Sequence, residues 1–256
     1  MKKELKKEQS IYIYIDYVIN SVATRGIDFC DFVNGIGLLP ENLLLLKHHL
    51  DDTSFNAHTL FHYLEAGDIH KLQVQEERKQ EAFSWIDFEE VDLLNQLTAQ
   101  EIAELLYLAH TGRHLRSPFY YKLQNNFVYL SSSDGHINKT YYRHINRFYT
   151  LLSYCITKRT ADLVSEKSIF SFGKKKDVAN ISESLIETLV PLFKEGVYLD
   201  FANAKKSRTQ IEIPLFANVG EEIVHTDAID KGSEVASIIY DNRRSEWEIS
   251  KKNKPY

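Results

Sequence analysis

Residues 138–162, NKTYYRHINRFYTLLSYCITKRTAD, have the most regular hydrophobic pattern in the chain. Their apolar side chains recur at intervals of three and four residues, which predicts an amphipathic helix with one buried face. We therefore expect this helix to contribute one side to the core and to expose the other. The expected buried stripe consists of Tyr141, Ile145, Phe148, Leu152 and Cys155.

More helices are predicted on the N-terminal side of this stretch. The best marked begins at Thr98, since Thr98 and Glu101 have the spacing of a capping box, and Gly112 is placed to end it. Residues 11–20 are also assigned to a helix, although their alternation of Ile and Tyr fits a strand as well. The remaining helices are expected over residues 43–50, 54–66 and 88–97.

Strand patterns are predicted in two regions. Residues 118–131 alternate on both sides of Asn125 and Asn126, which predicts a short hairpin. After a helix that begins near Ser182, is interrupted at Pro191 and ends at Gly196, the chain alternates with period two. A turn at residues 241–244 is expected to join the last two strands.

These patterns predict an α+β protein that is predominantly helical. A helical, bundle-like part is expected over residues 1–166, with its short hairpin near 118–131. A smaller part over 177–256 is expected to hold one helix and an antiparallel sheet, either as a second domain or packed with the first as one. Gly and Pro together number 15 of 256 residues, which supports the helical bias.

The cysteines and the hydropathy indicate a cytoplasmic location. Cys30 and Cys155 are far apart and have neither metal-binding nor redox spacing, so we expect both to be reduced thiols. No apolar run approaches the roughly 20 residues that a membrane helix needs, so no membrane association is expected. The basic N-terminus is not followed by a cleavable apolar segment of the signal-peptide type.

The charges are distributed unevenly along the chain. The formal net charge is −5, yet residues 10–110 hold 5 basic and 17 acidic side chains, whereas residues 111–160 hold 8 basic and one acidic. The same basic block carries ten aromatic side chains. We therefore predict a basic, aromatic-rich surface within residues 113–159. Its candidate anion-binding residues are Arg113, Arg116, Lys122, Lys139, Arg143, Arg147, Tyr154 and Lys158.

Three interpretations of this surface remain open. Its cations can pair internally with the acidic segments of residues 10–110, and this is the simplest of the three. They can instead bind an acidic protein partner, or the phosphates of a nucleic acid on whose bases the tyrosines stack. The net negative charge of the chain weighs against a nucleic-acid-binding protein.

A metal site is a weaker alternative. His58 and His62 are four residues apart on the helix predicted over 54–66, and Glu65 lies on the same face, so the three can act as ligands for Zn or Fe. The position after His58 is Thr59, however, where the zinc-protease pattern has a catalytic glutamate. A metal-dependent enzyme is therefore kept only as an alternative, and no cofactor is expected otherwise.

No phosphate-binding, dinucleotide-binding, hydrolase or kinase motif is present in the sequence. The sequence thus predicts a non-enzymatic, cytosolic binding or regulatory protein that engages an acidic partner through the basic surface. No resemblance to a known family supports or replaces this prediction.

Overall fold

The computed structural model describes residues 9–46, 53–71, 84–131, 137–165, 177–218 and 231–252, and the chain divides into two compact units. Neither unit is continuous in sequence. Unit 1 consists of Met1–Ile15, Thr24–Gly35 and Phe148–Tyr256, and unit 2 of Asp16–Ala23 and Ile36–Arg147. Strand β2 (Ser21–Arg25) contains the point at which the chain passes from unit 2 to unit 1.

The prediction of a predominantly helical protein is wrong. Among the described residues 36% lie in strands and 31% in helices, with thirteen strands and seven helices. The strand pairs within each unit are antiparallel. Several strands are buried on both faces, as in NLLL of β3 (Asn42–Leu45) and WIDF of β6 (Trp85–Phe88). Such strands lose the alternation that distinguishes a strand from a buried helix, which is why a helix was predicted over β3.

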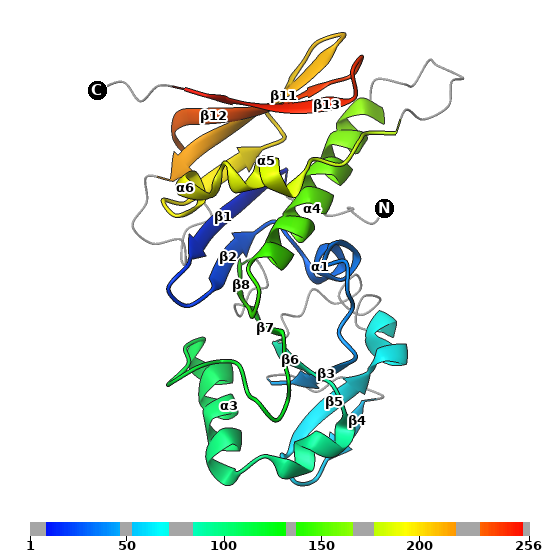
Figure 1. Cartoon of the computed structure of the whole chain (residues 1–256), viewed down its shortest axis with the longest axis vertical. Helices are drawn as coiled ribbons and strands as arrows, with labels where there is room; N and C mark the ends of the chain where they lie inside the picture. The colour runs from blue at the N-terminus through cyan, green and yellow to red at the C-terminus, as the bar shows by residue number, and fades with distance from the viewer. Residues whose placement is uncertain are drawn as a thin grey trace, which may run out of the picture. The chain divides into compact units, whose positions relative to one another are not determined.

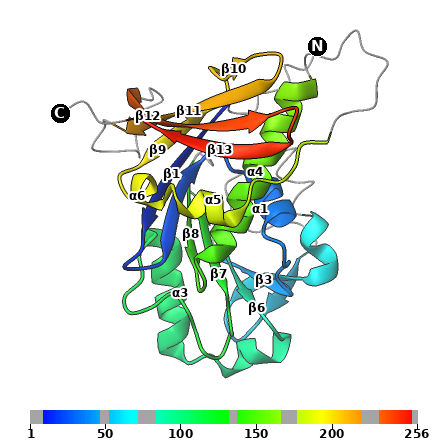
Figure 2. The same cartoon turned by 45° about the horizontal axis from the view of Figure 1, so that its top comes forward.

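Unit 1 contains a five-stranded antiparallel sheet in the order β13-β12-β11-β9-β1 (Figures 1 and 2). In β1, Ile11, Ile13 and Ile15 are all buried. The helix predicted over residues 11–20 is thus wrong, and the alternation was the correct signal. The strands are β1 (Ser10–Asp16), β9 (Val197–Asp200), β11 (Gln210–Asn218) with the short β10 (Lys205–Lys206) paired to it, β12 (Lys231–Asp241) and β13 (Glu246–Lys251).

The helices of unit 1 are α1 (Phe29–Gly35), α4 (Asn146–Ser165), α5 (Glu183–Glu187) and α6 (Val190–Phe193). Ser153 of α4 donates from Oγ to the carbonyl of Ile181 at 2.5 Å, which ties α4 to the segment that leads into α5. A Cβ atom at Gly35 would lie 2.8 Å from Leu151 Cδ1 and from Tyr154 Cδ1. Glycine at this position therefore allows α1 to pack closely against α4.

Unit 2 contains a six-stranded antiparallel sheet in the order β8-β7-β6-β3-β5-β4 (Figure 1). The helices predicted over residues 43–50 and 54–66 are wrong: β3 and a β4–β5 hairpin occupy the described parts of these ranges, and residues 47–50 lie outside them. The additional elements are β4 (Ser54–Asn56), β5 (Phe61–Glu65), β7 (Phe127–Ser131), β8 (Ile137–Tyr142), α3 (Ala99–Thr111) and the 3-10 helices η1 (Ala66–Asp68) and η2 (Val91–Gln96).

The core of unit 2 lies between this sheet and α3. Leu44, Ile86 and Val128 from the sheet join Leu105 and Leu108 of α3 in one buried apolar cluster. Burying such side chains contributes roughly 1.5–3 kcal/mol each. The core therefore fixes α3 and the chain that leaves it, which matters for the site described below.

Two local predictions are confirmed. The turn at residues 241–244 joins β12 and β13, and the carboxylate of Asp241 accepts hydrogen bonds from the backbone N–H groups of Arg243 at 2.7 Å and Arg244 at 3.0 Å. The helix that begins after Ser182 is interrupted as expected, because α5 and α6 are separate and Pro191 lies in the first turn of α6. Each feature depends on residues close together in sequence.

Residues 138–162 contain both a strand and a helix. Ile137–Tyr142 form β8 and α4 begins only at Asn146, so the predicted continuous helix is wrong in its first third. The expected stripe is nevertheless almost completely buried, because Tyr141, Phe148, Leu152 and Cys155 are each at most 1% exposed. Side chains of a strand and of a helix can thus share a burial pattern that resembles one helical face. The predicted hairpin at 118–131 is shifted in the same way, since β7 pairs with β8.

Candidate functional site

The chain that leaves α3 carries several of the basic side chains selected from the sequence. The capping box of α3 is present: Glu101 N–H donates to Thr98 Oγ1 at 3.2 Å, and Thr98 N–H donates to Glu101 Oε2 at 2.7 Å. Gly112 ends the helix with φ +64°, a left-handed conformation that costs glycine little. Residues 112–126 then lead to β7, and we call this segment the α3–β7 loop. It contains three basic residues and no acidic one.

The buried side chain of Asn125 holds the α3–β7 loop in shape. Its Oδ1 accepts from the backbone N–H of Tyr120 at 2.8 Å, and its Nδ2 donates to the carbonyls of Pro118 at 3.1 Å and Phe127 at 3.4 Å. Asn125 is 0% exposed, so these bonds lie away from competing water. The loop therefore has a defined conformation in spite of its length.

Asp87 of β6 holds the end of the same loop. Its Oδ1 accepts from the backbone N–H of Phe127 at 2.6 Å, and its Oδ2 from that of Asn126 at 2.9 Å. Burial raises the pKa of Asp87 to about 7, although these backbone N–H groups act to lower it. The sequence offered one signal for this anchor, an acidic residue inside the otherwise apolar WIDF of β6.

One cation, Arg143 in the turn after β8, contacts the α3–β7 loop, and a second, Lys139 of β8, lies over a tyrosine ring that is hydrogen-bonded to the loop. Arg143 donates from Nε to the carbonyl of Asn125 at 2.8 Å, and its guanidinium carbon lies 5.2 Å from the ring centroid of Phe119. Lys139 Nζ lies 5.0 Å from the ring centroid of Tyr141, whose hydroxyl donates to the carbonyl of Gly112 at 3.3 Å. Cations at such distances from aromatic rings are stabilised by the ring quadrupole.

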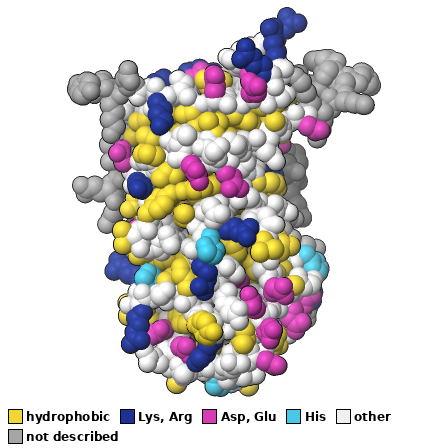
Figure 3. All heavy atoms as spheres, in the orientation of Figure 1, with side chains coloured by type: hydrophobic (Ala, Val, Ile, Leu, Met, Phe, Trp, Pro, Cys, Tyr) yellow, Lys and Arg dark blue, Asp and Glu magenta, His cyan; other side chains and the backbone are white. Residues whose placement is uncertain are grey.

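Arg113 and Arg116 are exposed, and no carboxylate in the described part of the chain pairs with them or with Arg143. Large apolar side chains are exposed on the same loop, with Leu115 61% and Tyr121 92% accessible. Figure 3 shows Lys and Arg side chains gathered on the side of unit 2 that carries α3. We define the loop surface as Arg113, Leu115, Arg116, Tyr121 and Arg143.

Two of the predicted cations are neutralised within their own units. Lys122 Nζ lies 2.7 Å from Glu101 Oε2 in unit 2. Partial burial alone would raise the pKa of Glu101, but the hydrogen bonds from Lys122 and Thr98 lower it below its ordinary value. Lys158 Nζ lies 2.9 Å from Asp31 Oδ1 in unit 1. Burial alone would lower the pKa of Lys158, and its contact with Asp31 raises it instead.

The five predicted residues that were expected on the helix over 138–162 do not all lie on one helix. Lys139 lies on β8 and Arg143 in a turn, and only Arg147, Tyr154 and Lys158 belong to α4. Within unit 1, Lys158 lies over the ring of Tyr154 at 5.3 Å. Lys122 and Lys158 are thus paired internally, while Arg113, Arg116 and Arg143 have no carboxylate partner among the described residues.

The candidate metal ligands lie on a hairpin and its turn, so the helical spacing that suggested them is absent. His58 is in the β4–β5 turn with Nε2 2.7 Å from the carbonyl of Leu97, and His62 is on β5 with Nδ1 2.8 Å from Thr53 Oγ1. Glu65 ends β5, three residues from His62, and side chains at that spacing on a strand point to opposite faces. The described residues contain no group of three or more His, Cys, Asp or Glu side chains arranged to hold a metal ion.

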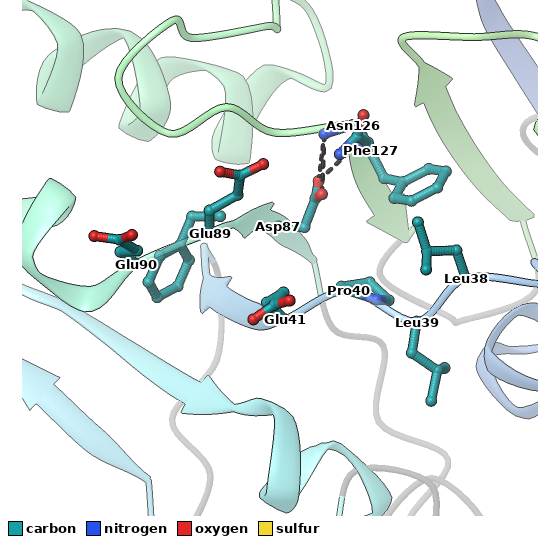
Figure 4. Close-up of a pocket in the computed structure, with 10 residues that line it drawn as sticks. Leu38, Leu39, Pro40, Glu41, Asp87, Glu89, Glu90, Asn126 and Phe127 are labelled. Carbon is teal, nitrogen blue, oxygen red and sulfur yellow. Dashed lines mark hydrogen bonds between the residues drawn. The ribbon is translucent and has the colours of Figure 1, made fainter.

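A cavity of about 350 Å³ lies beside the Asp87 anchor in unit 2. Figure 4 shows Asp87 turned toward the backbone of Asn126 and Phe127, and Glu89 and Glu90 directed elsewhere. The carboxylate of Asp87 is therefore used for structure, and its partners are backbone groups of the chain. The cavity is lined by Leu38, Leu39, Pro40, Glu41, Asp87, Phe88, Glu89, Glu90, Asn126 and Phe127.

Comparison with known proteins gave no match among protein families, curated proteins or solved structures. Within the described residues, no helix has both the length and the apolar character required to cross a bilayer. Cys30 and Cys155 form no disulfide with each other, and Cys155 is buried. The candidate function therefore rests on the geometry and charge of the loop surface.

Proposed function

We propose that the protein is a cytosolic, non-enzymatic binding protein whose loop surface engages an acidic segment of a protein partner. The observation that carries this proposal is the presence of exposed Arg113 and Arg116, without carboxylate partners among the described residues, beside exposed Leu115 and Tyr121. Arginine and tyrosine are, with tryptophan, enriched among the residues that contribute most to binding energy at protein interfaces.

The anchoring of the loop supports this function. Asn125 and Asp87 fix the backbone of residues 118–127, and Thr111 Oγ1 accepts from the backbone N–H of Arg113 at 3.2 Å, so less conformational entropy is lost when a partner binds. Arg143 is held against Phe119 and the carbonyl of Asn125, and an arginine held this way can still present its other N–H groups to a carboxylate. The surface thus combines preorganised cations with apolar area.

A peptide partner is favoured over a nucleic acid by the side chains between the cations. Nucleic-acid grooves typically align many cations with stacking aromatics along the phosphate backbone. Here Lys122 is already paired with Glu101, and Leu115 provides apolar area rather than a stacking ring. Nucleic acid is therefore kept as an outcome of the experiment below.

Fluorescence anisotropy with two labelled probes tests the proposal. The first probe is a peptide of alternating Glu and Leu, and the second is a single-stranded oligonucleotide of equal net charge. We expect the full-length protein to bind the peptide more tightly than the oligonucleotide. The double substitution Arg113→Glu with Arg116→Glu is expected to weaken peptide binding by a factor of ten or more, about 1.4 kcal/mol or more.

The matched control is Arg243→Glu with Arg244→Glu, which makes the same change of charge at two exposed residues of the β12–β13 turn. This control is expected to bind the peptide as the unchanged protein does. Equal losses in both double variants would reduce the effect to net charge and contradict the proposal. Tighter binding of the oligonucleotide would replace it with nucleic-acid recognition.

A further inference from the structure

Strand β13 is an edge strand of the sheet in unit 1. Within the described residues it pairs only with β12, from Ala236 opposite Lys251 to Asp241 opposite Glu246. Figure 2 shows β13 as the last strand on its side of this sheet. An edge strand presents backbone N–H and C=O groups that can pair with another strand.

The register shows which backbone groups face outward. Lys252 N–H donates to the carbonyl of Val235 at 3.0 Å, so this pair is hydrogen-bonded. Hydrogen-bonded and non-hydrogen-bonded pairs alternate along an antiparallel ladder. The backbone N–H and C=O groups of Ser250 and Glu248 therefore bond to β12, while those of Trp247, Ile249 and Lys251 point away from it.

A second copy of β13 that runs antiparallel can bond to these outward groups only if its own outward-facing residues lie opposite Trp247, Ile249 and Lys251. In the register centred on Ile249, the two Ile249 residues are opposite each other and Trp247 is opposite Lys251. Glu248 is then opposite Ser250, and Glu246 is opposite Lys252, which already contacts Glu234 at 2.6 Å. A shift by one residue toward the start of β13 opposes Glu248 with its own copy, and like charges in opposite positions are destabilising. A shift by one residue the other way opposes Ser250 with its own copy and places Trp247 opposite a position beyond the end of β13, so it pairs fewer of the outward backbone groups.

We propose that two copies of this chain associate through their β13 edges, antiparallel and centred on Ile249, to form a continuous sheet across a two-fold axis. The charge complementarity of Glu246 with Lys252 and the alignment of outward backbone groups select a second copy as the occupant. Edge-to-edge pairing of this kind derives its affinity from main-chain hydrogen bonds. The proposal is independent of the loop surface, which belongs to unit 2.

Light scattering coupled to size exclusion tests this pairing on the full-length protein. We expect a mass of about twice 29.8 kDa at high protein concentration. Ile249→Pro removes an outward N–H that β12 does not use, and proline is tolerated at such edge positions. This variant is expected to give 29.8 kDa with an unchanged circular dichroism spectrum. Ile249→Val, which keeps the N–H, is expected to remain dimeric.

Cysteine cross-linking tests the register and does not depend on the proline variant folding. Opposed residues of a hydrogen-bonded pair have Cα atoms about 5.5 Å apart, within the range for a disulfide. In a Cys30→Ser background, Ile249→Cys is expected to cross-link two chains on mild oxidation, and Ser250→Cys to cross-link far less. A monomer at every concentration would overturn the proposal. So would a dimer that persists in folded Ile249→Pro, or equal cross-linking at the two positions.

Discussion

The buried carboxylate of Asp87 shows how one side chain can hold a functional segment in place. It accepts hydrogen bonds from the backbone N–H groups of Asn126 and Phe127 at the point where β7 begins. The backbone carbonyl of the preceding Asn125 accepts a hydrogen bond from Arg143 Nε. The β6–β7 ladder runs only from Trp85 opposite Tyr129 to Ile86 opposite Val128. Asp87 therefore supplies the acceptor where the regular ladder stops.

We expect Asp87 to make stability depend on pH. Burial raises its native pKa from the ordinary 3.8 to about 7, so between these values the native state keeps a proton that the unfolded chain has lost. The contribution of the protonated Asp87 to the free energy of unfolding is complete below about pH 4 and is lost as the pH rises to about 7. At 1.36 kcal/mol per unit, the loss is about 4 kcal/mol.

Asp87→Asn removes this titration. In urea unfolding from pH 4 to pH 8, the variant is expected to lose the decline in unfolding free energy that the unchanged protein shows. Asp92→Asn, at an exposed carboxylate of η2, is the matched control and is expected to keep the decline. A decline of the same size in Asp87→Asn would show that another group causes it.

At the scale of the element, α3 is specified by signals next to one another in sequence. Thr98, Glu101 and Gly112 mark its ends, and all three behave as predicted. Thr98→Ala removes an N-cap acceptor and is expected to lower the free energy of unfolding by about 1 kcal/mol. Chemical denaturation measures this change.

Gln100→Ala is the control for the cap, because Gln100 is an exposed side chain two residues further along. It is expected to change the unfolding free energy by less than about 0.5 kcal/mol. If both alanine variants were equally stable, the capping box would contribute nothing measurable to α3.

The elements that were predicted incorrectly lack such local signals. NLLL of β3 is an apolar run covered on both faces, and nothing within it distinguishes a strand from a helix. Only pairing with strands distant in sequence decides between the two, as when Leu44 pairs with Tyr63 on one side and with Ile86 on the other. The same limit applies to the β4–β5 hairpin, whose residues resembled a helix with histidines on one face.

At the scale of the whole molecule, both units are built from segments that are distant in sequence. We therefore predict that a fragment that begins at α4 does not fold. The fragment 148–256 lacks β1, which pairs with β9, and lacks Asp31, the partner of Lys158. We expect this fragment to be unfolded by itself, with poorly dispersed amide signals in its NMR spectrum. The full chain serves as the control, and a dispersed spectrum from the fragment would contradict the prediction.

The sequence determined the concentration of positive charge between Arg113 and Arg159, the ends of α3 and the final hairpin, because composition, caps and tight turns depend on neighbouring residues. The tertiary structure decided which charges remain available: Glu101 pairs with Lys122 and Asp31 with Lys158, whereas Arg113 and Arg116 stay exposed. The partners in each ion pair are distant in sequence. Coulomb interactions act through space, so only the folded chain distinguishes a neutralised cation from one that can bind a partner.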